Sequence, residues 1–161
     1  MKNTVLFISA VLFVLNISCK KEPVDEKTYP TDGLVSYFNF DNNLKDKMAN
    51  TPDGNNYGSA VFSDGRSGQA ITLNGFDQYV EFGRSTFRSG NDISVSAWLK
   101  RTGNGGMYTI ICDDFGVWIT ESNAGMAISL PVTQSASGPC TQNQWVHLVG
   151  TYDGTNIKVY I

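Results

Sequence analysis

Short runs in which apolar and polar residues alternate recur along most of this chain, and clusters of Gly, Asn and Asp separate them. In the clearest run, residues 93–100, four apolar residues alternate with Ser94, Ser96, Trp98 and Lys100. An alternation of period two places successive side chains on opposite faces of an extended strand. Several such runs at short spacing are typical of a sandwich or barrel, so we predict an all-β, antiparallel β-sandwich with no long helix.

Further runs of this kind cover residues 34–40, 71–73, 80–82, 108–112, 117–119, 126–130, 145–152 and 157–161. Asn-Gly or Asp-Gly pairs begin at residues 53, 64, 74 and 153, where we predict tight turns with the glycine at positive φ. Charged residues make up 17% of the chain and aromatic residues 12%, with 16 glycines. This composition favours a globular β protein over a helical or disordered one.

The N-terminus has the pattern of an export signal. Lys2 precedes an almost wholly apolar stretch, residues 5–17, which is too short for the ~20 residues needed to span a bilayer. The stretch ends at Ser18-Cys19, which resembles a lipobox, although Asn16 stands where Leu is usual. We predict a signal peptide over 1–18, acylation of Cys19, a charged tether over 19–30 and one domain over 31–161; the alternative is an ordinary secretory signal.

The tether carries the charged run 20–26, similar to segments that direct some lipoproteins to the outer face of the outer membrane. We therefore expect an exported protein, anchored by lipid to the outer membrane or cell surface of a Gram-negative bacterium. Membrane contact would be through this anchor only. The formal net charge of −3 gives no reason to expect nucleic acid as a partner.

Three cysteines are present, and lipid on Cys19 would leave Cys112 and Cys140. An even pair in an exported protein predicts a possible disulfide. It would close a loop of about 28 residues and contribute ~3 kcal/mol in the chain-entropy model. The alternative is two buried free thiols.

The sequence stops at Ile161 within an apolar alternation, with no turn or polar tail after it. An unpaired apolar strand at a sheet edge is a feature that natural proteins avoid. We therefore expect the domain to be incomplete at this end.

Five segments together resemble laminin-G-type domains of the concanavalin-A-like jelly rolls: residues 33–41, 68–75, 78–81, 93–100 and 144–154. They occur in the order of that family and span nearly all of residues 31–161. The resemblance implies a jelly-roll sandwich that binds a glycan or an extracellular protein. It also implies calcium as a possible cofactor, because such domains often bind one calcium ion at a loop rim.

Asp41 and Asp46 are the candidate calcium ligands, because the segment 41–46 places oxygen-bearing side chains close together after a predicted strand. The alternative is a polar loop built from Asx-turns.

Trp98, Trp145, His147 and Tyr160 are the candidate ligand-binding residues. Each is out of phase with the apolar positions of its own run, so all four would lie on an outward face if the strands are aligned. The alternative is that loops or a second layer cover them, or that His147 has a structural role.

Catalytic patterns are absent from the sequence. His147 is the single histidine, and no predicted strand carries acids two or four residues apart, as glycan-cleaving jelly rolls do. The adjacent Asp113 and Asp114 fit a solvated turn. We predict a non-catalytic binding module; the alternatives are an enzyme, or an accessory domain of one, whose catalytic part lies beyond Ile161, and a structural envelope protein.

Overall fold

The computed structural model of the chain describes residues 29, 31–83, 92–112, 115–129 and 133–161. The chain divides into two compact units, Met1–Asp32 and Gly33–Ile161, and the fold is that of the second unit. The signal peptide, Cys19 and nearly all of the tether lie outside the described residues, so those assignments stay predictions. No described helix is long and apolar enough to cross a membrane.

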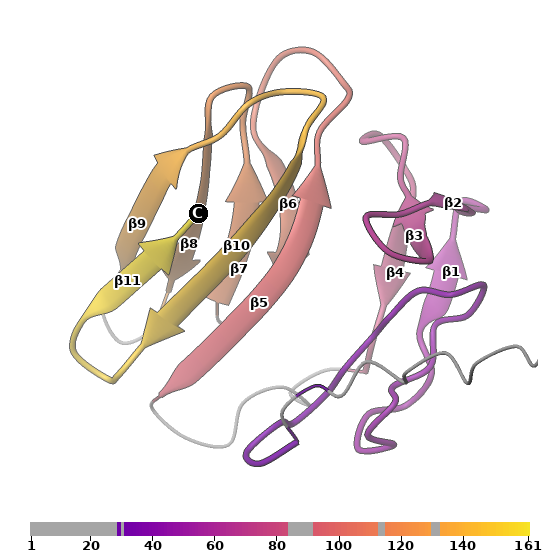
Figure 1. Cartoon of the computed structure of the whole chain (residues 1–161), viewed down its shortest axis with the longest axis horizontal. Coiled ribbons are helices and arrows are strands. Elements are labelled where there is room, and N and C mark those ends of the chain that lie inside the picture. Colours follow the sequence, from indigo (N-terminus) through magenta and orange to yellow (C-terminus); the bar gives the residue numbers. More distant parts are fainter. Residues whose placement is uncertain (1–28, 30, 84–91, 113–114, 130–132) are drawn as a thin grey trace, which may run out of the picture. The chain divides into compact units, whose positions relative to one another are not determined.

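The described part of the second unit contains eleven strands, paired in antiparallel fashion (Figure 1). In chain order they are β1 (Asn55–Tyr57), β2 (Val61–Asp64), β3 (Gln69–Thr72), β4 (Tyr79–Glu81), β5 (Ile93–Lys100), β6 (Tyr108–Cys112), β7 (Phe115–Ile119), β8 (Asn123–Ile128), β9 (Gln134–Pro139), β10 (Trp145–Tyr152) and β11 (Ile157–Tyr160).

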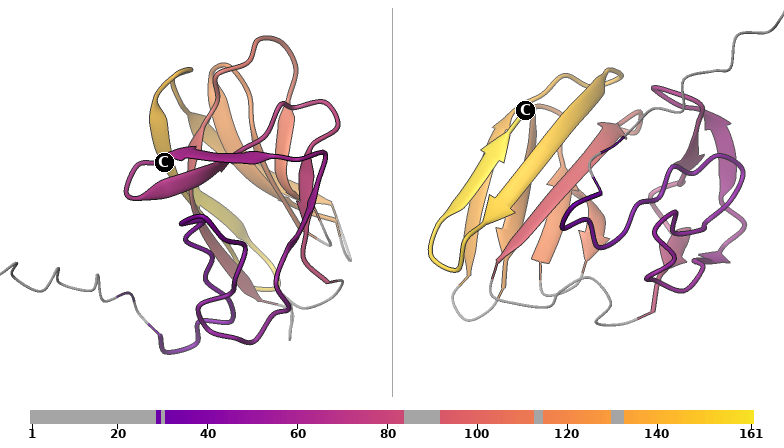
Figure 2. Two further views of the ribbon diagram at one scale, coloured as in Figure 1. Left: turned by 90° about the vertical axis from the view of Figure 1, so that its right-hand side faces the viewer. Right: turned by 60° about the horizontal axis from the view of Figure 1, so that its bottom comes forward.

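Two sheets form the body of the domain. One has the strand order β11-β10-β5 and the other is the meander β6-β7-β8-β9. The chain leaves the first sheet after β5, builds the whole second sheet, and returns as β10 beside β5. Figures 1 and 2 show the two sheets as separate layers. The predicted all-β, antiparallel sandwich is confirmed.

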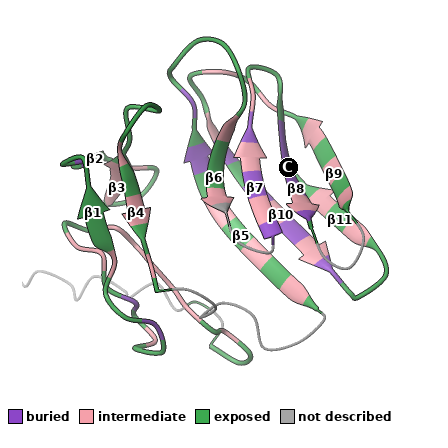
Figure 3. Cartoon of the chain, turned by 180° about the vertical axis from the view of Figure 1, so that it is seen from behind, coloured by how far each residue is buried: buried purple, intermediate pink, exposed green. Residues whose placement is uncertain are grey.

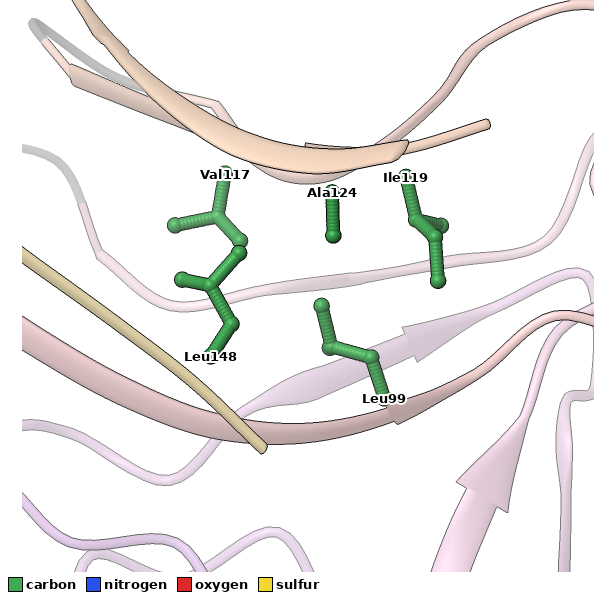
Figure 4. Close-up of a cluster of buried hydrophobic side chains, with 5 residues drawn as sticks. All are labelled: Leu99, Val117, Ile119, Ala124 and Leu148. Carbon is green, nitrogen blue, oxygen red and sulfur yellow. The ribbon is translucent and has the colours of Figure 1, made fainter. Parts of the chain in front are cut away.

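The core lies between these layers because the alternation in each strand turns one set of side chains inward. Figure 4 shows Leu99 and Leu148 of the first sheet facing Val117, Ile119 and Ala124 of the second. A second buried cluster beside it contains Phe115, Met126, Ile128 and Tyr152. Full burial of each large apolar side chain stabilises the fold by about 1.5–3 kcal/mol, so these contacts hold the layers together.

The remaining strands form two short ladders, β1 with β4 and β2 with β3. β3 and β4 therefore pair with different strands, and the expected tight turn at Asn74-Gly75 becomes a longer loop between them. Asn74 organises this loop, since its Oδ1 accepts hydrogen bonds from the backbone amides of Phe76, Asp77 and Gln78. Of the four predicted turn glycines, Gly75 and Gly154 have positive φ and Gly54 and Gly65 do not.

The predicted strand over 34–40 does not form. Instead of joining a ladder, Tyr37 donates its amide to the Asp46 carboxylate and accepts a hydrogen bond from the amide of Lys47 at its carbonyl. Phe40 has a positive φ of 56°, which an extended strand does not contain. A nearby carboxylate thus replaces the strand neighbour that the alternation led us to expect.

Gly150 lies where β10 packs tightly against Met126 of the other layer. It lies on the inward face of β10, and a Cβ atom there would overlap the Met126 side chain of β8 and would lie 3.0 Å from its Cβ. Because cores are packed at nearly crystalline density, such an added atom has no free space.

Replacement of Gly150 by alanine is expected to lower the free energy of unfolding by about 1–3 kcal/mol, because Met126 must move to admit the methyl group. The matched control is Gly116→Ala, also in a strand, where the new Cβ would meet only the carbonyl oxygen of Ile111 at 3.5 Å. Urea denaturation measures both. A Gly150→Ala protein as stable as the Gly116→Ala protein would contradict this packing.

Candidate functional site

The strand register brings the four predicted ligand-binding residues onto one face of the β11-β10-β5 sheet. Trp98 lies opposite His147, and Trp145 lies opposite Lys100 in the neighbouring row. Tyr160 lies opposite Val149, which is two residues beyond His147 on the same face of β10. Figure 3 shows the resulting alternation of exposure along β5 and β11.

Trp98 is the centre of a group of stacked side chains. The His147 ring stacks on it with the two ring centroids 4.8 Å apart, and the Cζ atom of Arg66 lies 5.2 Å from the Trp98 centroid. A hydrogen bond of 2.9 Å joins Nε2 of His147 to Oγ of Ser96. Trp98 is nevertheless 49% exposed, so a ligand would meet its edges together with the imidazole and the guanidinium.

A second cation–aromatic pair lies in the next row of the same face. Nζ of Lys100 lies 5.9 Å from the centroid of the half-buried Trp145 ring. Tyr160, 58% exposed, lies on the neighbouring strand β11. β5 bends around the core in Figure 4, so its outward side is convex. We call the outward residues of β5, β10 and β11, together with Arg66, the aromatic face.

Within the described residues, the aromatic face contains side-chain contacts that the sequence did not predict. His147 is exposed and stacked on Trp98, not packed in the core. Sequence reasoning missed Ser96, Lys100 and Arg66. The phase of 93–100 could have placed Ser96 and Lys100 beside Trp98, but no sequence signal links Arg66 to a strand that begins 27 residues later.

The protein-family model for the concanavalin A-like lectin/glucanases superfamily matches residues 73–161, which are more than half of the chain. The chain belongs to this superfamily. No curated protein and no solved structure matches it. The superfamily match includes every residue of the aromatic face except Arg66. Its fold serves in general as a carbohydrate- or protein-binding module.

A further aromatic pair, which the sequence analysis did not identify, lies on the β1–β4 ladder. Tyr57 and Tyr79 are directly opposite each other and their rings stack at 4.7 Å, and both are exposed. A hydrogen bond from Tyr57 to Glu81, together with the charge of that carboxylate, raises the pKa of Tyr57. Only the strand register reveals this pair, because 21 residues separate its members in the sequence.

Arg101 is a buried cation at the end of β5. Its guanidinium donates to the Gly105 carbonyl, lies 4.9 Å from the Tyr108 ring centroid and is 3.7 Å from the Glu121 carboxylate. The Arg101 carbonyl accepts a hydrogen bond from the amide of Asn143, just before β10. These contacts order the chain beside the Lys100–Trp145 row, and Arg101 itself is too buried to meet a ligand.

Asp46, a predicted calcium ligand, has a different role. Each carboxylate oxygen accepts two backbone amides at 2.8–3.0 Å: Oδ1 those of Tyr37 and Met48, Oδ2 those of Asn50 and Thr51. A carboxylate has about four lone-pair positions, so none remains for a metal ion. Burial raises the pKa of Asp46, but the four amide donors outweigh it and hold the pKa below its usual value.

Asp41, the other predicted ligand, is also engaged by the protein. Its Oδ1 accepts the amide of Gln69 and its Oδ2 the side-chain amide of Asn39, both at 2.8 Å. Asn43 donates to the Asp41 carbonyl and accepts the amide of Lys45. The polar loop with Asx-turns is thus what forms, and Asp46 has no carboxylate lone pair left for a calcium ion. Calcium binding by this segment stays a prediction. No described group of three or more His, Cys, Asp or Glu side chains could hold a metal.

The predicted disulfide between Cys112 and Cys140 is not formed. Cys140 is a free thiol packed beside the first core cluster, just after β9. The backbone of Cys112 pairs with Gly116, which pairs with Ala127, which pairs with Ser135 at the other end of β9. Three strand spacings of about 4.8 Å therefore separate the two cysteines, far beyond the ~7 Å between Cα atoms that a disulfide tolerates.

Asp46→Asn is expected to lower the free energy of unfolding by about 2–3 kcal/mol at neutral pH, because an amide nitrogen would face two backbone N–H donors. The folded-state pKa of Asp46 is lowered, so its stabilisation is full above the unfolded value of about 3.9 and disappears as pH falls through the folded value. Urea denaturation across pH measures this.

The control for Asp46→Asn is Asp53→Asn, which changes an exposed carboxylate in the same part of the chain. We expect Asp53→Asn to change the free energy of unfolding little at any pH. The free energies of unfolding of wild type and Asp46→Asn should converge at strongly acidic pH. If their difference stayed the same there, the charge of Asp46 would not be what stabilises this segment.

Proposed function

We propose that the protein is a surface-anchored, non-catalytic binding module and that its aromatic face binds carbohydrate. Aromatic rings bury apolar surface at little cost in conformational entropy, and sugars have apolar faces that stack on such rings. The observation that supports this proposal most is the alignment of Trp98, Trp145 and Tyr160 in neighbouring rows of one exposed face.

The polar groups of the face complement its rings. Ser96 and His147 form a hydrogen-bonded pair beside Trp98 and are both exposed, so their hydroxyl and imidazole can exchange that bond for bonds to a ligand. The convex shape suits a chain of sugars lying across the strands better than a small molecule, which is usually enclosed in a concavity.

The non-catalytic part of the proposal follows from the absence of paired acids. Glycan hydrolysis normally needs two carboxyl groups about 5–9.5 Å apart across the scissile bond. The outward strand positions of the aromatic face carry no carboxylate in the described residues. Binding without cleavage is therefore the expected behaviour of this face.

Trp145→Ala and Tyr160→Ala are each expected to weaken polysaccharide binding about fivefold, because loss of one aromatic contact removes about 1 kcal/mol. The measurement is biolayer interferometry of the full chain, in mild detergent, on immobilised polysaccharides of different composition. Phe76→Ala is the control, since Phe76 is 93% exposed and lies outside the aromatic face. Equal binding by all variants would exclude this face as the site.

The surface anchor is the second part of the proposal, and it rests on the apolar stretch that ends at Ser18-Cys19. Growth with radiolabelled palmitate is expected to label the full chain and to leave a Cys19→Ala variant unlabelled. Cys140→Ala, which removes a thiol of the folded domain, should label normally. Equal labelling of wild type and Cys19→Ala would remove the lipid anchor from this proposal.

A further inference from the structure

The charge on the aromatic face is opposite in sign to that of the whole chain. The chain has 15 acidic and 12 basic residues and a net charge of −3. The outward positions of the three strands, in contrast, carry Lys100 and Lys158 and no acid. Arg66 adds a third cation over Trp98. Local potential is set by nearby charges, so this face is electropositive on an acidic protein.

Two of the three cations are held in place without being neutralised. Arg66 lies over Trp98 and Lys100 over Trp145, and neither forms an ion pair among the described residues. A cation over an aromatic ring keeps its full charge, whereas a salt bridge would cancel it. The side chains are also partly ordered in advance, which reduces the entropy that a ligand must remove on binding.

Two carboxylates lie at the end of these strands where β10 turns into β11. Asp153 accepts the amides of Asn156 and Thr155 in the β10–β11 turn. These hydrogen bonds lower the pKa of Asp153, and the charge of Lys158 lowers it further by a smaller amount. Asp92 precedes β5 at that same end, since Ile93 pairs with Tyr152. Lys158 is thus partly compensated by Asp153, whereas Arg66 and Lys100 form no ion pair among the described residues.

Hydrogen bonds at the tip of the β2–β3 hairpin fix the turn that carries Arg66. The amide of Gly65 donates to the Gly68 carbonyl at 2.9 Å, and the amide of Gln69 donates to Asp41. Gly68 has a φ of +63° and is pressed against the Asp41 carboxylate, so no other residue fits there without strain. Arg66 lies outside the superfamily match at residues 73–161.

We infer that the aromatic face binds a negatively charged polysaccharide, with Arg66 and Lys100 contacting its carboxylate or sulfate groups beside the tryptophan rings. The inference rests on the proposed carbohydrate-binding function and adds the charge of the ligand. Cations alone would attract any polyanion. Cations that lie over aromatic rings, with the Ser96–His147 pair beside Trp98, also match the hydroxyls and apolar faces of sugars.

The decisive ligands are polygalacturonate and the same polymer with its carboxylates methyl-esterified, which share a backbone and differ in charge. We expect the full chain to bind the acidic form at least about tenfold more tightly and to lose this preference near 0.5 M salt. Dextran sulfate, which carries sulfate and no carboxylate, and neutral xylan are the additional ligands. They distinguish sulfate from carboxylate and charged from uncharged chains.

Arg66→Gln and Lys100→Gln are each expected to weaken binding of the acidic polymer about fivefold, while binding of the esterified polymer stays the same. Lys47→Gln is the matched control, because Lys47 is exposed and lies in the 44–51 loop, outside this face. Thermal melting of each variant checks that the fold is intact.

The possible outcomes separate the two proposals. Equal binding of acidic and esterified polymer, or equal effects of Lys47→Gln and Arg66→Gln, would overturn the charge inference and leave carbohydrate binding in place. Binding to no polysaccharide would overturn both proposals. Binding of single-stranded DNA as tightly as polygalacturonate would show unspecific attraction of polyanions and would also overturn the inference.

Discussion

β5 and β10 pair over their whole lengths, and this ladder positions both the core and the exposed aromatic face. The register runs without a break from Trp145 with Lys100 to Tyr152 with Ile93. Because strand side chains alternate, a shift by one residue would exchange the buried set for the exposed set. The packing energy of the core therefore also maintains the arrangement of aromatic and cationic side chains on the opposite side of the same strands.

In the N-terminal part of the domain, polar side chains accept hydrogen bonds from backbone amides that strand ladders satisfy in the sandwich. Asp46 collects four backbone amides, and Asn74 collects three. Asp41 secures the β2–β3 hairpin that carries Arg66. Backbone groups left without a partner are costly wherever water is excluded, so such side-chain acceptors stabilise a segment with few ladder bonds. The Asp41 hydrogen bond matters for the proposed ligand, because it fixes the hairpin that carries Arg66.

The errors of sequence interpretation have a common cause. Alternation in 34–40 predicted a strand, and an even cysteine pair predicted a disulfide. Each inference needed to know what lies across from a residue, and a single sequence does not contain that information. β9 was missed for a related reason: Gln134–Pro139 has no apolar alternation and is a strand only because β8 pairs with it. The Tyr57–Tyr79 pair was missed for the same reason, because only the pairing of β1 with β4 brings the two rings together.

The sequence by itself determined the fold class, the main strands of the sandwich and the outward phase of Trp98, Trp145, His147 and Tyr160 within their own strands, because these follow from a period of two that every strand imposes on its own side chains. Only the tertiary structure decided that Arg66 joins the aromatic face, that Asp46 binds backbone amides, and that Cys112 and Cys140 are far apart. Those facts depend on which strands are neighbours, and long-range pairing is settled by the packing of the whole core.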